Sequence, residues 1–87
     1  MRIYKYPLEI VDHQFLVLPE GAEILSVAEQ NDYIVLYALV DEKETELDEI
    51  PIKIIGTGNP VENIEGYEFI GTVKIYGGKL VFHVFYQ

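Results

Sequence analysis

The stretch "EILSVAEQNDYIVLYALV", residues 23–40, places the dipeptide Asn31-Asp32 between two long, largely apolar runs. Asn and Asp tolerate the positive φ angles that a two-residue hairpin turn requires, and the flanking runs are rich in residues that favour strands. The stretch therefore predicts an antiparallel hairpin in which Gln30 lies opposite Tyr33.

The register of this hairpin determines which side chains share a face. Counting back from the turn places Val27 opposite Leu36 and Leu25 opposite Ala38 on one face. The pairs on the other face are also largely apolar. We expect a hairpin with two apolar faces to occupy the centre of a sheet.

A second hairpin is predicted at "YGGK", residues 76–79, because two adjacent glycines adopt a type I′ turn without steric cost. In this register Ile75 lies opposite Leu80, and Thr72 lies opposite His83 on the other face.

Alternating apolar and polar residues recur along the rest of the chain, and helical periodicity is almost absent. The chain is therefore expected to be one all-β domain over residues 1–87, built as a mainly antiparallel small sandwich or partly open barrel. About seven strands are predicted: Ile3–Tyr6, His13–Leu18, Glu23–Gln30, Tyr33–Asp41, Ile50–Gly56, Tyr67–Tyr76 and Lys79–Tyr86.

The charge balance limits the class of partner. The chain has 15 acidic against 6 basic side chains, a net charge of −9, and Arg2 is its single arginine. Proteins bind nucleic-acid phosphates mainly through Lys and Arg. Direct binding to nucleic acid is therefore not expected, and the many tyrosines are better explained by sheet packing.

Other compositional features concern location and cofactors. There is no cysteine, which excludes disulfides and thiolate metal sites and suits a reducing cytoplasm. No apolar run approaches the roughly 18 residues that would span a bilayer, and the first residues lack the apolar core of a secretory signal. We expect a cytoplasmic protein without a membrane segment or a cofactor.

The glycine-rich stretch "IIGTGNPV", residues 54–61, lacks the third glycine of a dinucleotide fingerprint and the lysine of a phosphate-binding loop. A turn that ends the preceding strand explains both glycines. The alternative is a binding loop in which Thr57 and Asn59 supply hydrogen-bonding groups.

His83 alternates with apolar residues, so the simplest interpretation is a partly buried histidine that bonds to Thr72 across the strands. Catalysis would require a partner side chain at a diagnostic spacing, and neither histidine of the chain has one. We therefore expect neither an enzyme nor a metal site.

The acidic run "DEKETELDE", residues 41–49, connects the fourth and fifth predicted strands. It lacks the alternating ligands and the glycine of a calcium-binding loop. It is either a solvated loop or an electrostatic docking surface for a basic partner, in which Glu42, Glu44, Glu46 and Asp48 would make the contacts.

Taken in order, the motifs "YKYPL", "LPEGAEILSVAEQN", "ALVD", "GTGNP", "IGT" and "LVFHVF" resemble those of a family of small uncharacterised proteins encoded by bacteriophages and prophages. The resemblance covers nearly the whole chain and implies a phage origin and a compact β domain. In that family the turn often reads G-T-G-H-P, whereas Asn59 stands at the histidine position here. The resemblance carries no activity over to this chain.

Two functional hypotheses from different classes follow. The first is a non-enzymatic interaction protein that binds a host or anti-phage defence protein, through a basic surface of that partner, in an infected bacterium. The second is a ligand-binding or sequestering β domain with Thr57, Asn59 and His83 around a pocket, for which a homo-oligomer is left open. A minor virion or assembly component is a third alternative.

Overall fold

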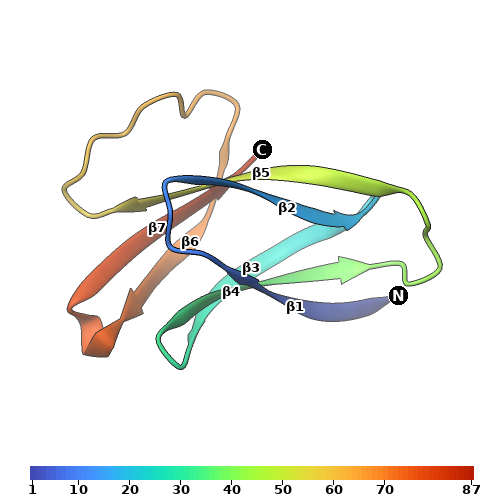
Figure 1. Ribbon diagram of the computed structural model, residues 1–87, viewed down its shortest axis with the longest axis horizontal. Coiled ribbons are helices and arrows are strands. Elements are labelled where there is room, and N and C mark those ends of the chain that lie inside the picture. The colour runs from blue at the N-terminus through green and yellow to red at the C-terminus, as the bar shows by residue number, and fades with distance from the viewer.

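The computed structural model describes residues 1–87, which form two antiparallel sheets packed face to face as a sandwich that does not close into a barrel (Figure 1). The all-β prediction is confirmed. One sheet has the strand order β1-β4-β3 and the other has the order β2-β5-β7-β6. The strands are β1 (Arg2–Leu8), β2 (His13–Pro19), β3 (Glu23–Gln30), β4 (Tyr33–Val40), β5 (Leu47–Gly56), β6 (Glu68–Ile75) and β7 (Leu80–Tyr86).

The core forms where the inward faces of the two sheets meet. On β4 every second side chain points inward, and Ile34, Leu36, Ala38 and Val40 are no more than 1% exposed. This alternation follows from strand geometry, because successive side chains point to opposite faces. Buried residues of the other strands complete the cluster: Leu8, Leu18, Ile52, Ile54, Val73, Ile75 and Val84.

The hairpin of residues 23–40 is present, but only one of its strands is central. β4 lies between β1 and β3, whereas β3 is an edge strand of its sheet. β3 packs beside β6 of the other sheet, and a Cβ atom on Gly71 would come within 3.1 Å of Val27 Cγ2. The sequence pattern predicts a central position for β3. In the structure β3 is an edge strand, and β6 packs beside it.

The predicted turn at Asn31-Asp32 is confirmed, and the chain also turns at Gly77-Gly78 as predicted, but there within a short 3₁₀ element, η1 (Tyr76–Gly78). Asn31 and Asp32 have φ angles of 51° and 64°, and Gly77 and Gly78 have φ angles of 66° and 88°. Positive φ at both central residues is the requirement of a type I′ turn. Tyr76, the first residue of η1, also has a positive φ of 52°, which was not expected of a tyrosine.

Two β-bulges interrupt the predicted registers. The pairing of Leu25 with Ala38 is wrong, because a bulge between Ile24 and Ser26 places Ile24 opposite Ala38 and leaves Leu25 exposed. The register of the second hairpin is confirmed from Ile75↔Leu80 through Thr72↔His83 to Gly71↔Val84, and a second bulge follows between Phe69 and Gly71.

The largest error in strand bounds concerns β5, which begins at Leu47 and not at Ile50. Leu47, Asp48 and Glu49 pair with the last three residues of β2, so the end of the acidic run belongs to the sheet. β1 is also longer than predicted at both ends. No helix in the structure is long and apolar enough to cross a membrane.

Candidate functional site

His83 is held between two threonine hydroxyls on the outer face of the four-stranded sheet. Thr72 Oγ1 of the neighbouring strand β6 lies 3.0 Å from His83 Nδ1, and Thr57 Oγ1 lies 2.7 Å from His83 Nε2. The predicted bond across the strands is confirmed, and Thr57 adds a second one. Both ring nitrogens are therefore engaged, and the groups that orient the ring are neutral hydroxyls, where a hydrolase triad uses a carboxylate.

Thr57 reaches His83 because the stretch "GTGNP" forms a turn at the end of β5. Asn59 N–H donates to the Gly56 carbonyl at 3.1 Å, Gly58 has a φ of 89°, and Thr57 N–H donates to the carbonyl of Val81 at 3.1 Å. The Asn59 amide packs so closely on Gly56 that a Cβ atom there would lie 2.9 Å from Asn59 Nδ2. The predicted turn is confirmed, with its glycines serving conformation and close packing.

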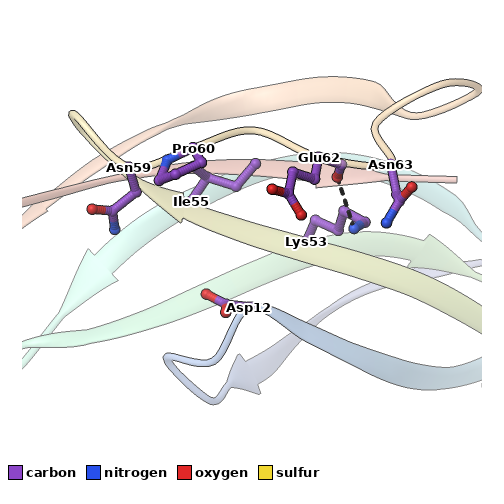
Figure 2. Close-up of a pocket in the computed structure, with 7 residues that line it drawn as sticks. All are labelled: Asp12, Lys53, Ile55, Asn59, Pro60, Glu62 and Asn63. Atoms are coloured by element: carbon purple, nitrogen blue, oxygen red, sulfur yellow. Dashed lines mark hydrogen bonds between the residues drawn. The ribbon is translucent and has the colours of Figure 1, made fainter.

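After this turn, the connection to β6 passes over the outer face of the same sheet and encloses a cavity of about 380 Å³ (Figure 2). Lys53 Nζ donates to the Glu62 carbonyl at 3.2 Å and lies 5.6 Å from the centroid of the Tyr67 ring. These contacts tie the connection to the sheet. The lining is mostly polar and consists of Asp12, Lys53, Ile55, Asn59, Pro60, Glu62 and Asn63.

The predicted ligand-site residues Thr57, Asn59 and His83 thus lie near one another in the fold, but they do not line one cavity. Asn59 lines the cavity, whereas Thr57 and His83 bond to each other beside it and are not among its lining residues. Lys53, Asp12 and Glu62 were not predicted as site residues. Lys53 and Asp12 come from β5 and the β1–β2 connection, so no local motif marked them.

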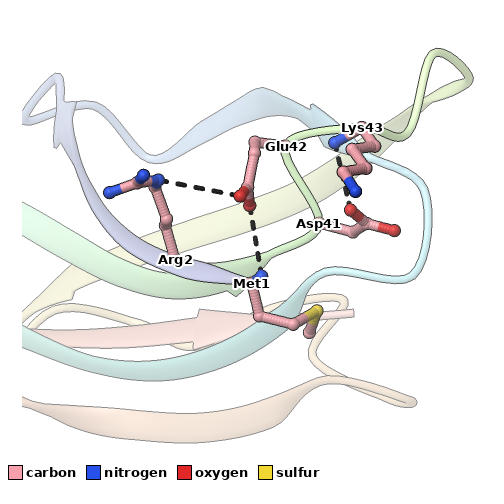
Figure 3. A network of polar contacts seen from close by, with 5 residues as sticks. All are labelled: Met1, Arg2, Asp41, Glu42 and Lys43. Atoms are coloured by element: carbon pink, nitrogen blue, oxygen red, sulfur yellow. Dashed lines mark hydrogen bonds and ion pairs between the residues drawn. The ribbon is translucent and has the colours of Figure 1, made fainter.

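The acidic segment, residues 41–46, folds back on itself between β4 and β5. Lys43 N–H donates to Asp41 Oδ1 at 3.0 Å, and Glu46 N–H donates to Glu44 Oε1 at 3.0 Å. Glu42 lies 3.3 Å from the N-terminal ammonium and 3.6 Å from Arg2 Nε (Figure 3). One of the predicted docking carboxylates is therefore already paired within the chain, through exposed contacts of the kind that add little stability.

The four predicted docking carboxylates also differ in position. Glu42 and Glu46 are exposed, whereas Glu44 and Asp48 are half-buried. Asp48 belongs to β5 and lies opposite Leu18, a fully buried residue of β2. It therefore points to the core side of the sheet, away from the outer face that Leu47 and Glu49 share.

The whole chain matches one known protein family. The model of a family described as "Domain of unknown function (DUF7352)" matches residues 1–87. The chain belongs to this family. No curated protein and no solved structure matches the chain.

For this DUF7352 chain, a feature that sequence reasoning missed is the apolar character of the outer face of the four-stranded sheet. Phe15, Val17, Leu47 and Phe69 lie on this face and are each half or more exposed. The signal was present in "HQFLVLP", residues 13–19, where apolar residues occupy both faces of the strand. Apolar side chains grouped on an exposed face are typical of interaction sites.

Proposed function

We propose that this protein is a non-enzymatic interaction domain that binds a host or anti-phage defence protein in the cytoplasm of an infected bacterium. The phage context rests on the resemblance of its motifs to phage and prophage proteins. The interaction function rests on one observation, namely the exposed apolar residues on the outer face of the four-stranded sheet beside a strongly acidic segment.

The docking surface is defined by four residues of paired strands, Phe15, Val17, Leu47 and Glu49, together with the acidic segment 41–46. Val17 pairs with Glu49, and Leu47 continues directly from the acidic segment. Apolar side chains therefore lie next to carboxylates at one end of the molecule. Protein interfaces combine an apolar centre with a polar rim in this way, and a rim of one sign selects a partner of the opposite sign.

Affinity capture from infected cells, followed by mass spectrometry, tests this proposal. The parent chain is used as bait beside a variant that carries Val17→Ser and Leu47→Ser, and beside a control with Val61→Ser. Val61 is 54% exposed but lies in the connection between β5 and β6, outside the docking surface.

The parent and the Val61 control are expected to capture the same partner, with a basic surface, and the double variant to lose it. The proposal fails when no protein is enriched by the parent, or when all three baits capture the same set. Capture of phage structural proteins would favour the virion alternative.

A second candidate function is binding of a small polar ligand, which the cavity of about 380 Å³ over the outer face favours. Lys53, Asn59 and the carboxylates of Asp12 and Glu62 provide donors and acceptors to such a ligand. Native mass spectrometry of protein isolated from infected cells tests it. A retained mass that Asn59→Ala abolishes would support ligand binding, and an unliganded mass in parent and variant would contradict it.

A further inference from the structure

A second cavity, of about 490 Å³, lies where three connections of the fold meet. The connection between β1 and β2 forms one wall, and the two hairpin turns form the others. These turns lie at the end of the molecule opposite the acidic segment (Figure 1). The residues that matter for its chemistry are Pro7, Glu9, Ile10, Asp32, Tyr33 and Tyr76, and we call it the tyrosine cavity.

Hydrogen bonds fix each wall of the tyrosine cavity. Asp32 Oδ1 accepts a hydrogen bond of 2.9 Å from Tyr76 N–H and so joins the turn of one sheet to the turn of the other. Glu9 N–H donates to Gln14 Oε1 at 3.1 Å, and Gln14 Nε2 donates back to the Glu9 carbonyl at 2.7 Å. The cavity is therefore built from restrained segments although it lies among loops.

The backbone of Tyr76 is unusual in a way that concerns this cavity. Tyr76, Gly77 and Gly78 have φ angles of 52°, 66° and 88° and form one tight turn, so a tyrosine shares a backbone conformation that the two glycines adopt without steric cost. Such a conformation is unfavourable for a bulky residue and persists only when surrounding contacts hold it. One such contact is the bond from Tyr76 N–H to Asp32, and Tyr76 is among the residues that line the cavity.

The charges and aromatic groups of the lining favour a cationic ligand. Tyr33 and Tyr76 are 64% and 53% exposed, and the groups of the lining that are charged at neutral pH are the carboxylates of Glu9 and Asp32. The nearby basic residue Lys5 is not among these lining residues; it lines a neighbouring cavity of about 220 Å³ that shares Pro7 and Tyr33 with the tyrosine cavity. Aromatic faces attract cations, and neighbouring carboxylates attract the same positive charge and accept its hydrogen bonds.

We propose that the tyrosine cavity binds an arginine side chain of the protein partner. A guanidinium group is planar, stacks on aromatic rings and forms forked hydrogen bonds with carboxylates, which a lysine ammonium does not. The carboxylate of Glu9 takes part in no ion pair and no hydrogen bond within the chain and is free to accept such a fork. This inference rests on the proposed function, because it assigns to the same basic partner a second contact, at the end of the molecule opposite the docking surface (Figure 1).

A titration with a blocked Gly-Arg-Gly tripeptide, followed by amide chemical shifts of the labelled protein, tests the assignment without any partner. A salt concentration of about 0.15 M suppresses non-specific attraction to the acidic chain. We expect saturable shifts centred on Glu9, Asp32, Tyr33 and Tyr76. The matching tripeptides with citrulline and lysine should give no shifts and weaker shifts, respectively.

Two variants and two matched controls locate the binding. Glu9→Gln and Tyr33→Ala should each lower the association constant of the arginine tripeptide about three- to tenfold. Glu65→Gln and Tyr4→Ala change exposed residues outside the cavity and should leave it unchanged. Because the same spectra report whether each variant is folded, a loss of binding is not confused with unfolding.

The assignment is overturned when the arginine shifts map elsewhere, when citrulline gives equal shifts, or when the two cavity variants bind like the parent. These outcomes are separate from a failure of the proposed function, which is judged by partner capture. A captured partner that binds Tyr33→Ala as tightly as the parent would remove the cavity from the interface while leaving the interaction function in place.

Discussion

Two tyrosine side chains have a raised pKa, and the physical cause differs between them. Burial raises the pKa of Tyr6, with a smaller contribution from the charge of Tyr4. For Tyr86, the hydroxyl donates to Glu68 Oε2 at 3.0 Å, and this hydrogen bond raises the pKa most, followed by burial and by the nearby carboxylates. In both cases the folded state holds the phenolic proton more tightly than the unfolded chain does.

A raised pKa in the folded state makes stability fall as the pH rises past the ordinary tyrosine value of 10. Below that value both states keep the proton, and above it the unfolded chain releases the proton first and is favoured. We expect Tyr86→Phe to lower the free energy of unfolding by up to about 1 kcal/mol at neutral pH, where the bond to Glu68 is lost. The difference from the parent should shrink between pH 10 and 11.

Melting midpoints recorded from pH 8 to 11 measure this difference, with Tyr33→Phe at an exposed site as the control. Parallel curves for the parent and Tyr86→Phe over the whole range would show that the Glu68 bond does not hold the proton.

At the scale of residues, the contacts that follow from strand register could be predicted and those between distant segments could not. His83 and Thr72 lie opposite each other because the Gly77-Gly78 turn fixes their pairing. Thr57 meets the same ring from a turn after another strand, and Asp32 meets Tyr76 across 44 positions of sequence. No local pattern contains either contact.

Among the elements, the hairpin that joins β6 and β7 depends most clearly on backbone conformation. Gly78 has a φ of 88°, and a Cβ atom built on it would meet nothing within 4 Å. A side chain at this position meets no steric clash, so the positive φ of the backbone is the only feature that disfavours a substitution. We expect Gly78→Val to lower the free energy of unfolding by on the order of 1 kcal/mol or more, because a β-branched residue is poorly tolerated at positive φ.

Denaturant titration of Gly78→Val beside Gly78→Asn provides the measurement and its control. Asparagine accepts positive φ, so its loss of stability should be smaller. Equal midpoints for the parent and the valine variant would show that the turn relaxes into another type.

The presence of each strand could be predicted because the signals of a hairpin are local in sequence. Where a strand begins and where a bulge interrupts it depend on the strands that pair with it. The sequence pattern predicts that residues 47–49 belong to an acidic loop. They form the start of β5 because they pair with the end of β2. The bulge at Leu25 is equally invisible in the sequence, since an uninterrupted register also places apolar residues inward.

For the whole molecule, the net charge of −9 is the property most relevant to a basic partner. Substituting the four predicted docking carboxylates, as Glu42→Gln, Glu44→Gln, Glu46→Gln and Asp48→Asn, should preserve the fold. A glutamine amide oxygen at position 44 can still accept the bond from the backbone N–H of position 46, and the ion pairs of Glu42 are exposed. Binding to the captured partner should weaken, chiefly through slower association.

The association rates of parent and variant should converge as salt rises towards about 0.5 M, where the Debye length is only about 4 to 5 Å. A control with Asp12→Asn, Glu23→Gln, Glu62→Gln and Glu65→Gln removes as much charge outside the segment and should slow association less. Identical rates for parent and docking variant at every salt concentration would exclude the acidic segment from the interface.

The choice between a sandwich and a barrel could not be made from the sequence, because it depends on which edges remain unpaired. Pairing of β1 with β4, of β2 with β5 and of β5 with β7 joins segments that are far apart in the chain. Hairpin signals identify neighbours in sequence and say nothing about such pairings.

The first two strands of the chain belong to different sheets and pair only with strands that come later, and this order has a consequence for biosynthesis. As the polypeptide leaves the ribosome, β1 has no hydrogen-bonding partner until β4 ends at Val40, and β2 has none until β5 ends at Gly56. The cover over the inward face of the β1-β4-β3 sheet is completed only when β7 emerges, because β7 joins β5 to β6. The nascent chain therefore carries unpaired strands for most of its translation. During this period it is most prone to aggregate and most accessible to chaperones.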